Sequence, residues 1–194
     1  MTKLHDGRTQ DAWVKELAKE DNWNERHALA LFGLIGVQQT YLDVGSGTGA
    51  WVNIARKLGT RAWGVDQLER PEGYFFQADL REPFSLAKKC GKSVVDLVTC
   101  FEVAEHLPPE CDNYICDTCA SHVRQGGLLF WTSAYPGQGG HAHIGIRPNV
   151  HWHDKFHERG LTYVPILSRQ IALLWSNIDS RLMYLSSNIQ VFAR

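Results

Sequence analysis

The stretch over residues 41–51, YLDVGSGTGAW, most constrains what this chain can fold into. Its apolar start predicts a short buried strand over 41–44, and the residues that follow predict a helix over 50–58. Three glycines lie between the two elements: Gly45, Gly47 and Gly49. Glycine adopts positive φ without steric cost, so a ligand can approach the backbone there. The first N–H groups of the helix lack intrahelical partners and suit an anionic or polar ligand.

Asp43 stands directly before this turn. A carboxylate at the end of a strand repels phosphate and suits a cationic or amine-bearing ligand. The spacing G-x-G-x-G also differs from the dinucleotide pattern G-x-G-x-x-G, so both features disfavour a nicotinamide-dependent oxidoreductase. On the turn residues alone, a plain strand-to-helix connection is the alternative to a binding loop.

Length and composition favour one globular domain over residues 1–194, because 194 residues with 44% hydrophobic content can bury a sizeable core. The formal net charge of −1 implies no global attraction to nucleic acid or membrane. No apolar run has the length of a membrane span, and the first residues lack a signal-peptide pattern, so we expect a cytoplasmic protein without a membrane partner. The odd number of cysteines, five, predicts reduced thiols.

The remaining patterns alternate between helix and strand, which is typical of an α/β fold. A strand over 61–66 follows the first helix, and this βαβ unit implies a parallel sheet with a right-handed connection. Further strands are predicted over 74–80, 93–100, 128–133, 161–164 and 182–192. Helices are predicted over 11–20, 25–35, 108–124, 149–159 and 168–175, with residues 21–24 and 125–127 as breaks. The helices within residues 1–37 are expected to cover an edge of the sheet or the active site.

The segment over 43–49, DVGSGTG, resembles motif I of the class I S-adenosylmethionine-dependent methyltransferases. The resemblance extends over roughly residues 41–160. It implies a Rossmann-like, seven-stranded, mostly parallel sheet with helices on both faces. It also implies that the last two strands form a hairpin and that the final strand is antiparallel. S-adenosylmethionine is the cofactor that the resemblance implies.

Asp66 ends the second predicted strand, where an acid can accept hydrogen bonds from both ribose hydroxyls. The resemblance places Asp79 near the adenine amino group, whereas a solvated loop aspartate is the alternative. The expected cofactor-binding residues are Asp43, Gly45, Ser46, Gly47, Gly49, Asp66, Gln67, Asp79, Leu80 and Phe101.

Glu102, Glu105 and His106 follow the predicted strand over 93–100. Their Glu-x-x-Glu-His pattern resembles the segment that binds a divalent metal in small-RNA 2′-O-methyltransferases and in some ubiquinone-pathway O-methyltransferases. Carboxylates with an imidazole suit Mg²⁺, Mn²⁺ or Zn²⁺, and a bound metal lowers the pKa of a coordinated hydroxyl. The alternative is a metal-free role in which the acid caps a helix or orients a loop.

A glycine-rich loop over 134–148 has no periodicity, and loops of this length in compact domains are usually functional. Its GGHAH sequence, with a later Trp-x-x-x-Phe, resembles a pattern of poorly characterised viral and bacterial methyltransferases, which implies an imidazole over the transferring methyl group. Neutral histidine can take a proton from an attacking hydroxyl or amine. The candidate catalytic residues are therefore His141, His143, Glu102, Glu105 and His106.

Two other clusters invite a zinc interpretation, and both are disfavoured. The first comprises His151, His153 and His157, which lack a fourth ligand. The second is the series Cys111, Cys116, Cys119 and His122, which lies along one predicted helix and does not converge from a turn.

These patterns together predict an S-adenosylmethionine-dependent methyltransferase. We expect O-methyl transfer to a small-molecule or RNA hydroxyl, assisted by a histidine base or by a divalent metal. A non-catalytic, methyltransferase-like binding subunit and an N-methyltransferase of a nucleic acid or cap are the alternatives.

Overall fold

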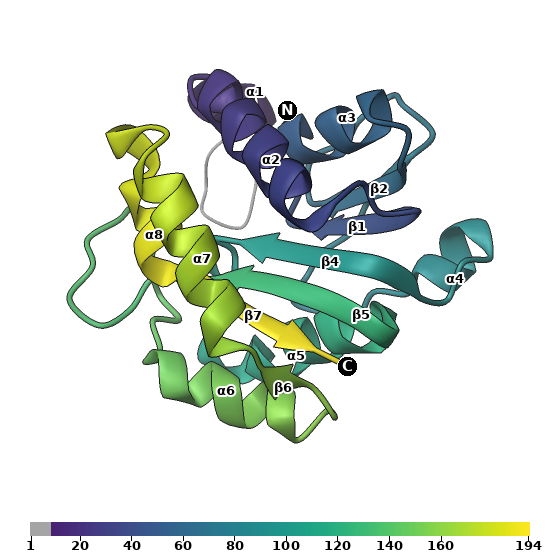
Figure 1. Cartoon of the computed structure of the whole chain (residues 1–194). Helices are drawn as coiled ribbons and strands as arrows, with labels where there is room; N and C mark the ends of the chain where they lie inside the picture. The colour runs from purple at the N-terminus through teal and green to yellow at the C-terminus, as the bar shows by residue number, and fades with distance from the viewer. Residues whose placement is uncertain (1–8) are drawn as a thin grey trace.

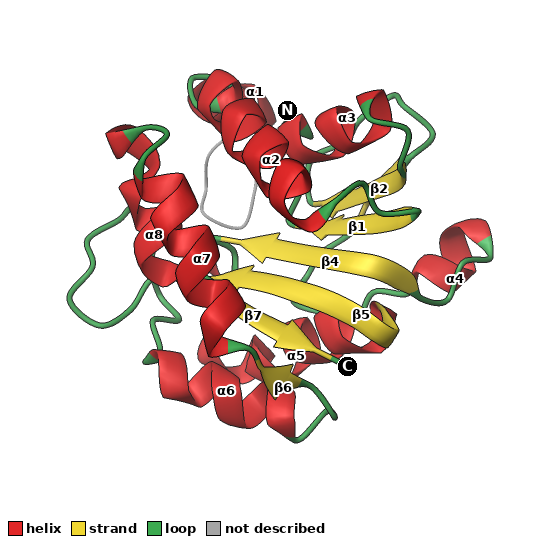
Figure 2. Cartoon of the chain, viewed as in Figure 1, coloured by secondary structure: helices red, strands yellow, loops and turns green. Residues whose placement is uncertain are grey.

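The computed structural model describes residues 9–194, which form a seven-stranded sheet with helices on both faces (Figure 1, Figure 2). The strand order is β3-β2-β1-β4-β5-β7-β6. The pairs from β3 to β5 are parallel, and β7 runs antiparallel to both β5 and β6, which confirms the predicted fold class. The strands are β1 (Thr40–Val44), β2 (Arg61–Asp66), β3 (Phe75–Gln77), β4 (Val95–Phe101), β5 (Val123–Thr132), β6 (Thr162–Tyr163) and β7 (Gln190–Ala193).

Helices cover the two faces in separate groups, and each group encloses its own hydrophobic core. Residues of α2, α3, α7 and α8 fill one core, and residues of α4, α5 and α6 fill the other. The helices are α1 (Gln10–Leu17), α2 (Asp21–Ile35), α3 (Ala50–Lys57), α4 (Leu86–Cys90), α5 (Asp112–His122), α6 (Asn149–His157), α7 (Pro165–Ser176) and α8 (Met183–Asn188), with short 3₁₀ helices η1 (Ala104–His106), η2 (Pro109–Cys111) and η3 (Ser180–Leu182). None of the helices within residues 9–194 is both long and apolar enough to cross a membrane.

Strand β1 illustrates why the sheet is buried on both sides. All of its residues are buried, and Tyr41 points into one core while Leu42 and Val44 point into the other. Successive side chains of a strand face opposite sides, so a continuous apolar run is the sequence of a doubly covered parallel strand. The predicted strand over 41–44 therefore lies at the centre of the fold.

The C-terminal segment differs from its prediction. A strand was expected over 182–192, whereas the structure has η3, then α8, and β7 only from Gln190. Leu182 and Leu185 are buried while Met183 is 62% exposed, which is a helical spacing that the apolar composition disguised. Because α7 and α8 lie between β6 and β7 in the chain, these two strands pair without forming a tight hairpin.

Both predicted breaks are also corrected. Residues 125–127 do not terminate a helix, because α5 ends at His122 and the glycines lie within β5. Gly126 N donates to Arg194 O at 2.8 Å, and the register of β4 with β5 shifts there. Residues 21–24 belong to α2, whose first turn closes when Asn24 N donates to Glu20 O at 2.9 Å. Helix α4 corresponds to no predicted element.

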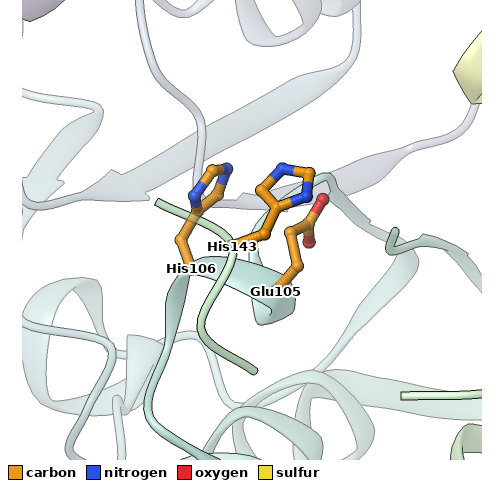
Figure 3. Close-up of side chains that lie close together, drawn as sticks. All are labelled: Glu105, His106 and His143. Carbon is orange, nitrogen blue, oxygen red and sulfur yellow. The ribbon is translucent and has the colours of Figure 1, made fainter. Parts of the chain in front are cut away.

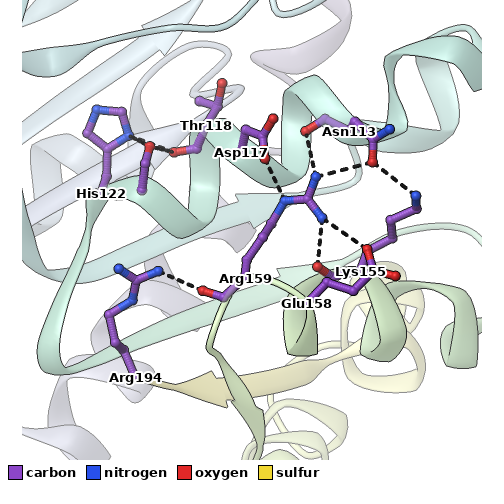
Figure 4. Close-up of polar contacts among 9 residues, drawn as sticks. Asn113, Asp117, Thr118, His122, Lys155, Glu158, Arg159 and Arg194 are labelled. Atoms are coloured by element: carbon purple, nitrogen blue, oxygen red, sulfur yellow. Dashed lines mark hydrogen bonds and ion pairs between the residues drawn. The ribbon is translucent and has the colours of Figure 1, made fainter.

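Helices α5 and α6 are joined by a polar network centred on Arg159 (Figure 4). Its Nε donates to Asp117 Oδ1 at 2.6 Å, and Arg194 Nη2 donates to its carbonyl oxygen at 2.9 Å. His122 in the same view donates from Nδ1 to Thr118 O, and its Nε2 accepts from the backbone of α4. Both nitrogens of His122 are therefore engaged by backbone groups, and the cysteine series along α5 packs in the core with free thiols.

Candidate active site

A cavity of about 650 Å³ lies where β1, β2 and β4 reach their carboxyl ends. The strand order reverses between β1 and β4, which is where open α/β sheets bind their ligands. Every expected cofactor residue except Gly49 lines this cavity: Asp43, Gly45, Ser46, Gly47, Asp66, Gln67, Asp79, Leu80 and Phe101. All candidate catalytic residues line it too: Glu102, Glu105, His106, His141 and His143.

The glycine turn has the positive φ angles that its sequence predicts, 78° at Gly45, 51° at Gly47 and 83° at Gly49. Two of these glycines serve the packing of the protein itself. A Cβ at Gly45 would overlap the side chain of Val103, and a Cβ at Gly49 would overlap the ring of Phe75. Gly45 and Gly47 line the cavity, and Gly49 is not among its lining residues.

Asp66 holds the turn against the end of β2. Its Oδ2 accepts from Gly47 N at 2.9 Å, and its Oδ1 accepts from Leu68 N at 2.9 Å. Asp79 is exposed and forms an ion pair with Arg81, whose Nη2 lies 2.5 Å from Asp79 Oδ2. The two acids therefore reach the same cavity from different environments.

Asp43 is almost fully buried at the end of β1. Thr99 Oγ1 donates to Asp43 Oδ1 at 2.5 Å, and the hydroxyl of Tyr41 lies 2.6 Å from Thr99 Oγ1. Burial raises the pKa of Asp43 to about 7, although both hydroxyl contacts favour the ionised carboxylate. This carboxyl group can therefore change its charge near neutral pH.

Glu102 follows β4 with a left-handed φ of 52°, a conformation that non-glycine residues rarely adopt. Its backbone N–H donates to the carbonyl and hydroxyl oxygens of Thr132, at 3.2 and 3.0 Å. The Asn188 amide donates to Glu102 Oε1 at 3.0 Å and also to Gln138 Oε1 at 3.0 Å. Strained residues of this kind cluster at ligand sites, where surrounding contacts hold them.

Glu105, His106 and His143 bring one ligand atom each to within 4.8 Å of one another (Figure 3). We call these three residues the acid–histidine cluster. Backbone hydrogen bonds bring these side chains together, because Glu105 O accepts from Ile144 N at 2.8 Å and from Gly145 N at 2.9 Å. These bonds dock the glycine-rich loop on η1 and bring the two imidazole rings to a centroid distance of 5.0 Å.

Glu105 is fully buried, and only one of its carboxyl oxygens has a hydrogen-bond partner, the backbone N–H of Ala134 at 3.2 Å. Burial, together with the negative charge of Glu102, raises the pKa of Glu105 well above its usual range. His143 Nδ1 is also buried without a partner. Buried polar atoms are almost always paired, so these two suit a ligand, a metal or a proton-transfer partner.

His141 is exposed and lines the cavity outside the acid–histidine cluster. The histidines of α6 do not converge on a site. His151 Nε2 lies 2.9 Å from Asp112 Oδ2, and the ring of His153 stacks on Tyr163 at 4.1 Å.

The sequence did not single out several residues of the cavity wall: Glu16, Glu20, Asn24, Trp51, Gln138, Tyr184 and Leu185. Gln138 lies in the loop that was expected to be functional, and this position is the only sequence feature that pointed to it. Glu20 accepts from the hydroxyl of Tyr184 at 2.7 Å, and Asn24 accepts from Trp51 Nε1 at 3.2 Å. These pairs join distant segments, so no local pattern could have indicated them.

Solved structures of methyltransferases share this fold at low sequence identity. The 1,6-didemethyltoxoflavin-N1-methyltransferase of Burkholderia thailandensis, bound to 1,6-didemethyltoxoflavin and S-adenosylhomocysteine, aligns with a TM-score of 0.61 and 15% identity over 92% of this chain and 80% of that one. A SAM-dependent methyltransferase from Archaeoglobus fulgidus aligns with a TM-score of 0.60 and 16% identity, over 91% of this chain and 97% of that one. The magnesium protoporphyrin IX methyltransferase of Synechocystis PCC 6803 with bound SAH aligns with a TM-score of 0.57 and 15% identity, over 75% of this chain and 74% of that one.

No curated protein sequence matches the chain. A family model does match it, described as a methyltransferase domain, and the match covers residues 11–169. That range includes the glycine turn, the acid–histidine cluster and the strands from β1 to β6. The chain therefore belongs to the methyltransferase domain family, with the fold of the class I S-adenosylmethionine-dependent enzymes.

Proposed function

We propose that the protein transfers the methyl group of S-adenosylmethionine to a hydroxyl group of its acceptor, and that the acid–histidine cluster receives the hydroxyl proton. One observation carries the proposal. Glu105, His106 and His143 meet within 4.8 Å on the wall of the same cavity that the glycine turn lines. A cofactor on the turn and a hydroxyl at the cluster would share one cavity.

The cofactor half of the cavity has suitable chemistry for S-adenosylmethionine. Each carboxylate oxygen of Asp66 already accepts one backbone N–H, and a carboxylate has lone pairs left for ribose hydroxyls. Asp43 offers a buried carboxyl to the positively charged part of the cofactor. Similar structures with bound S-adenosylhomocysteine support this choice of cofactor.

In the proposed reaction the acceptor oxygen attacks the methyl carbon. The sulfur–carbon bond breaks, its electron pair stays on sulfur, and the products are S-adenosylhomocysteine and a methyl ether. The acceptor proton passes to an imidazole nitrogen of His143, since neutral imidazole is an effective base near physiological pH. Gly145 and Ile144 hold the loop of His143 against Glu105, so the base is positioned before the acceptor arrives.

A divalent metal at the acid–histidine cluster is the second candidate. Glu105 Oε2 and His143 Nδ1 are buried without partners, and a carboxylate with two imidazoles suits Mn²⁺ or Zn²⁺. Three protein ligands would leave a coordination position for the acceptor. A metal there would lower the pKa of a bound hydroxyl and orient it.

The cofactor assignment is tested by titration calorimetry with S-adenosylmethionine. Replacing Gly47 with valine forces a β-branched residue to a φ of 51° on the cavity wall, and we expect affinity to fall at least about tenfold. Gly59→Val is the matched control, because φ is 97° there and its Cβ would meet no neighbour. Equal affinities in wild type and Gly47→Val would refute the cofactor assignment.

The catalytic assignment is tested by transfer of labelled methyl to a panel of phenols, catechols, aliphatic alcohols and RNA. If His143 is the base, His143→Ala lowers the rate about 10²–10⁴-fold, His141→Ala changes it little, and a chelator has no effect. If a metal is used, a chelator abolishes transfer without weakening cofactor binding, and Glu105→Ala behaves like the chelated enzyme. Full activity in both His143→Ala and Glu105→Ala would refute both versions.

A further inference from the structure

Carboxyl groups outnumber the histidines on the cavity wall, which His106, His141 and His143 also line. Seven carboxyl groups line it, and among the described residues no lysine or arginine does. The acids are Asp43, Asp66, Asp79, Glu16, Glu20, Glu102 and Glu105. Asp43 and Glu105 have raised pKa values, and the other five acids carry the negative charge of this wall. A phosphate-bearing or nucleic-acid acceptor would meet these like charges and no lysine or arginine of the described residues, whereas such ligands require cationic contacts.

Three of these acids belong to the cofactor half, and the four glutamates line the rest. Glu16 is partly neutralised by Lys19, whose Nζ lies 2.7 Å from Glu16 Oε2. Glu20 and Glu102 are held by neutral groups instead, the hydroxyl of Tyr184 at 2.7 Å and the Asn188 amide at 3.0 Å. Neutral donors fix a carboxylate in place without cancelling its charge.

Glu105 supplies a second and independent sign of a ligand. Its side chain is fully buried on the cavity wall, and its Oε2 has no hydrogen-bond partner. The carboxyl group of Glu105 lies beside the ring of His143 (Figure 3). A buried acceptor atom of this kind is normally satisfied, so a ligand with N–H or O–H donors would complete it.

Aromatic rings stand beside these acids. Trp51, Phe101 and Tyr184 all line the cavity, and the rings of Trp51 and Phe101 are 4.8 Å apart between centroids. Aromatic faces attract ammonium groups through their quadrupole, and they do so best where water is excluded. Aromatic rings and carboxylates without a lysine or arginine beside them suit a bound cation.

We propose that the methyl acceptor is a small molecule with a positively charged amino group, and that Glu20, Glu102 and the ring of Tyr184 bind this group. The inference rests on the proposed function, because it names the acceptor class for the same cavity. It selects the small-molecule acceptor over RNA. The hydroxyl of such a molecule would lie at the acid–histidine cluster while its ammonium group lies against the glutamates.

The test uses probes that differ only in charge. Tyramine, 4-ethylphenol and 4-hydroxyphenylacetate form a phenol set, and catechol and aliphatic alcohol sets are built in the same way. Each probe is titrated into the protein saturated with S-adenosylhomocysteine. We expect the amine of at least one set to bind about tenfold or more tightly than its neutral partner, and the carboxylate to bind most weakly.

Two glutamine variants test whether Glu20 causes the preference for the amine probe. Glu20→Gln keeps an acceptor for the Tyr184 hydroxyl and removes the charge, so we expect most of the preference for the amine to disappear while S-adenosylhomocysteine affinity stays unchanged. Glu25→Gln is the control, because Glu25 lies in α2, the helix that Glu20 precedes, is outside the cavity wall, and has its Oε1 3.8 Å from Lys57 Nζ. That variant should keep the preference.

Several results would overturn the inference. These are equal or tighter binding of a carboxylate probe, with or without added Mn²⁺, and the absence of binding by any amine probe. Loss of cofactor affinity in Glu20→Gln with an unchanged amine preference would also overturn it, because the charge would then serve the cofactor. Failure of S-adenosylhomocysteine to bind the wild type is a different result, which refutes the proposed function itself.

Discussion

The hydroxyl of Tyr184 donates a hydrogen bond to Glu20 Oε2 at 2.7 Å, across 164 positions of sequence. Burial raises the pKa of Tyr184, so the hydroxyl keeps its proton and remains the donor. Nearby, the guanidinium of Arg181 lies 4.1 Å from the centre of the Trp23 ring. Two segments far apart in the sequence thus meet at the cavity, and the α1–α2 turn and α8 build one part of its wall.

Replacing Tyr184 with phenylalanine tests this contact between Glu20 and Tyr184. The variant loses one hydrogen bond to a carboxylate, and we expect the free energy of unfolding to fall by about 0.5–1.5 kcal/mol. The KM for the acceptor should rise more than kcat falls, because the contact shapes the wall and does not touch the reacting atoms. Denaturant unfolding and steady-state kinetics measure both effects. Tyr114→Phe, an exposed ring on α5, is the control, and equal changes in the two variants would contradict the prediction.

Adjacent glycines in the loop provide a sharp test of the position of His143. A Cβ at Gly140 would overlap the His143 ring, whereas a Cβ at Gly139 meets nothing within 4 Å. We expect Gly140→Ala to displace the imidazole and lower methyl transfer about tenfold or more, with unchanged cofactor affinity. Gly139→Ala should behave like the wild type. If both variants keep full activity, the observed place of His143 has no role in the reaction.

Asp66 and Asp79 should contribute unequally to the affinity for S-adenosylmethionine. Asp66 is tied to the glycine turn through Gly47, and we expect Asp66→Ala to weaken S-adenosylmethionine binding by about 1.5–3 kcal/mol. Asp79 is exposed and already paired with Arg81, so Asp79→Ala should cost less. Calorimetry on both variants measures the difference. A larger loss at Asp79 would mean that the ribose is not held by Asp66.

Asp43 predicts a specific dependence of stability on pH. The pKa of Asp43 is about 7 in the folded protein and 3.8 for an unperturbed aspartate, so the folded state binds one more proton than the unfolded state at pH values between these two. Its contribution to stability is therefore complete below pH 4 and is lost as pH rises through 7. We expect the unfolding free energy of wild type to fall by about 2–4 kcal/mol relative to Asp43→Asn over that range. If the free energy of unfolding depends on pH in the same way in wild type and Asp43→Asn, the raised pKa of Asp43 is contradicted.

The same carboxyl should make cofactor binding depend on pH in the opposite direction. S-adenosylmethionine carries a positive sulfonium, and ionised Asp43 attracts it while the protonated form does not. Affinity should therefore increase between about pH 6 and 8 in wild type, and it should be weak and nearly constant in Asp43→Asn. Calorimetry in buffers with different ionisation enthalpies would also detect the released proton.

The first part of the fold was predictable because its signals are local. The apolar run over 41–44 determines a buried strand, and the glycines after it determine a turn with positive φ. Asp66 is placed by the end of the next strand, and Glu102, Glu105 and His106 come shortly after β4. In a parallel sheet the carboxyl ends of strands share one edge, so these residues had to approach each other.

The C-terminal third was less predictable because its signals compete. The apolar residues over 182–192 satisfy both a strand and a helix, and packing of Leu182 and Leu185 into the core selects α8. Likewise, the glycines at 126 and 127 suggest a helix end, yet pairing with Arg194 from the far end of the chain makes them part of β5. Local propensity is decided here by contacts that the local sequence does not contain.

The sequence by itself determined the strand–turn–helix unit, the order of α and β elements and the acids at strand ends, because each depends on neighbouring residues and on a short period. Only the tertiary structure decided that His143, and not His141, joins Glu105 and His106. It also decided that Glu20 and Tyr184 complete the wall. Those contacts depend on how loops pack against elements that are distant in the sequence. No single segment determines such packing.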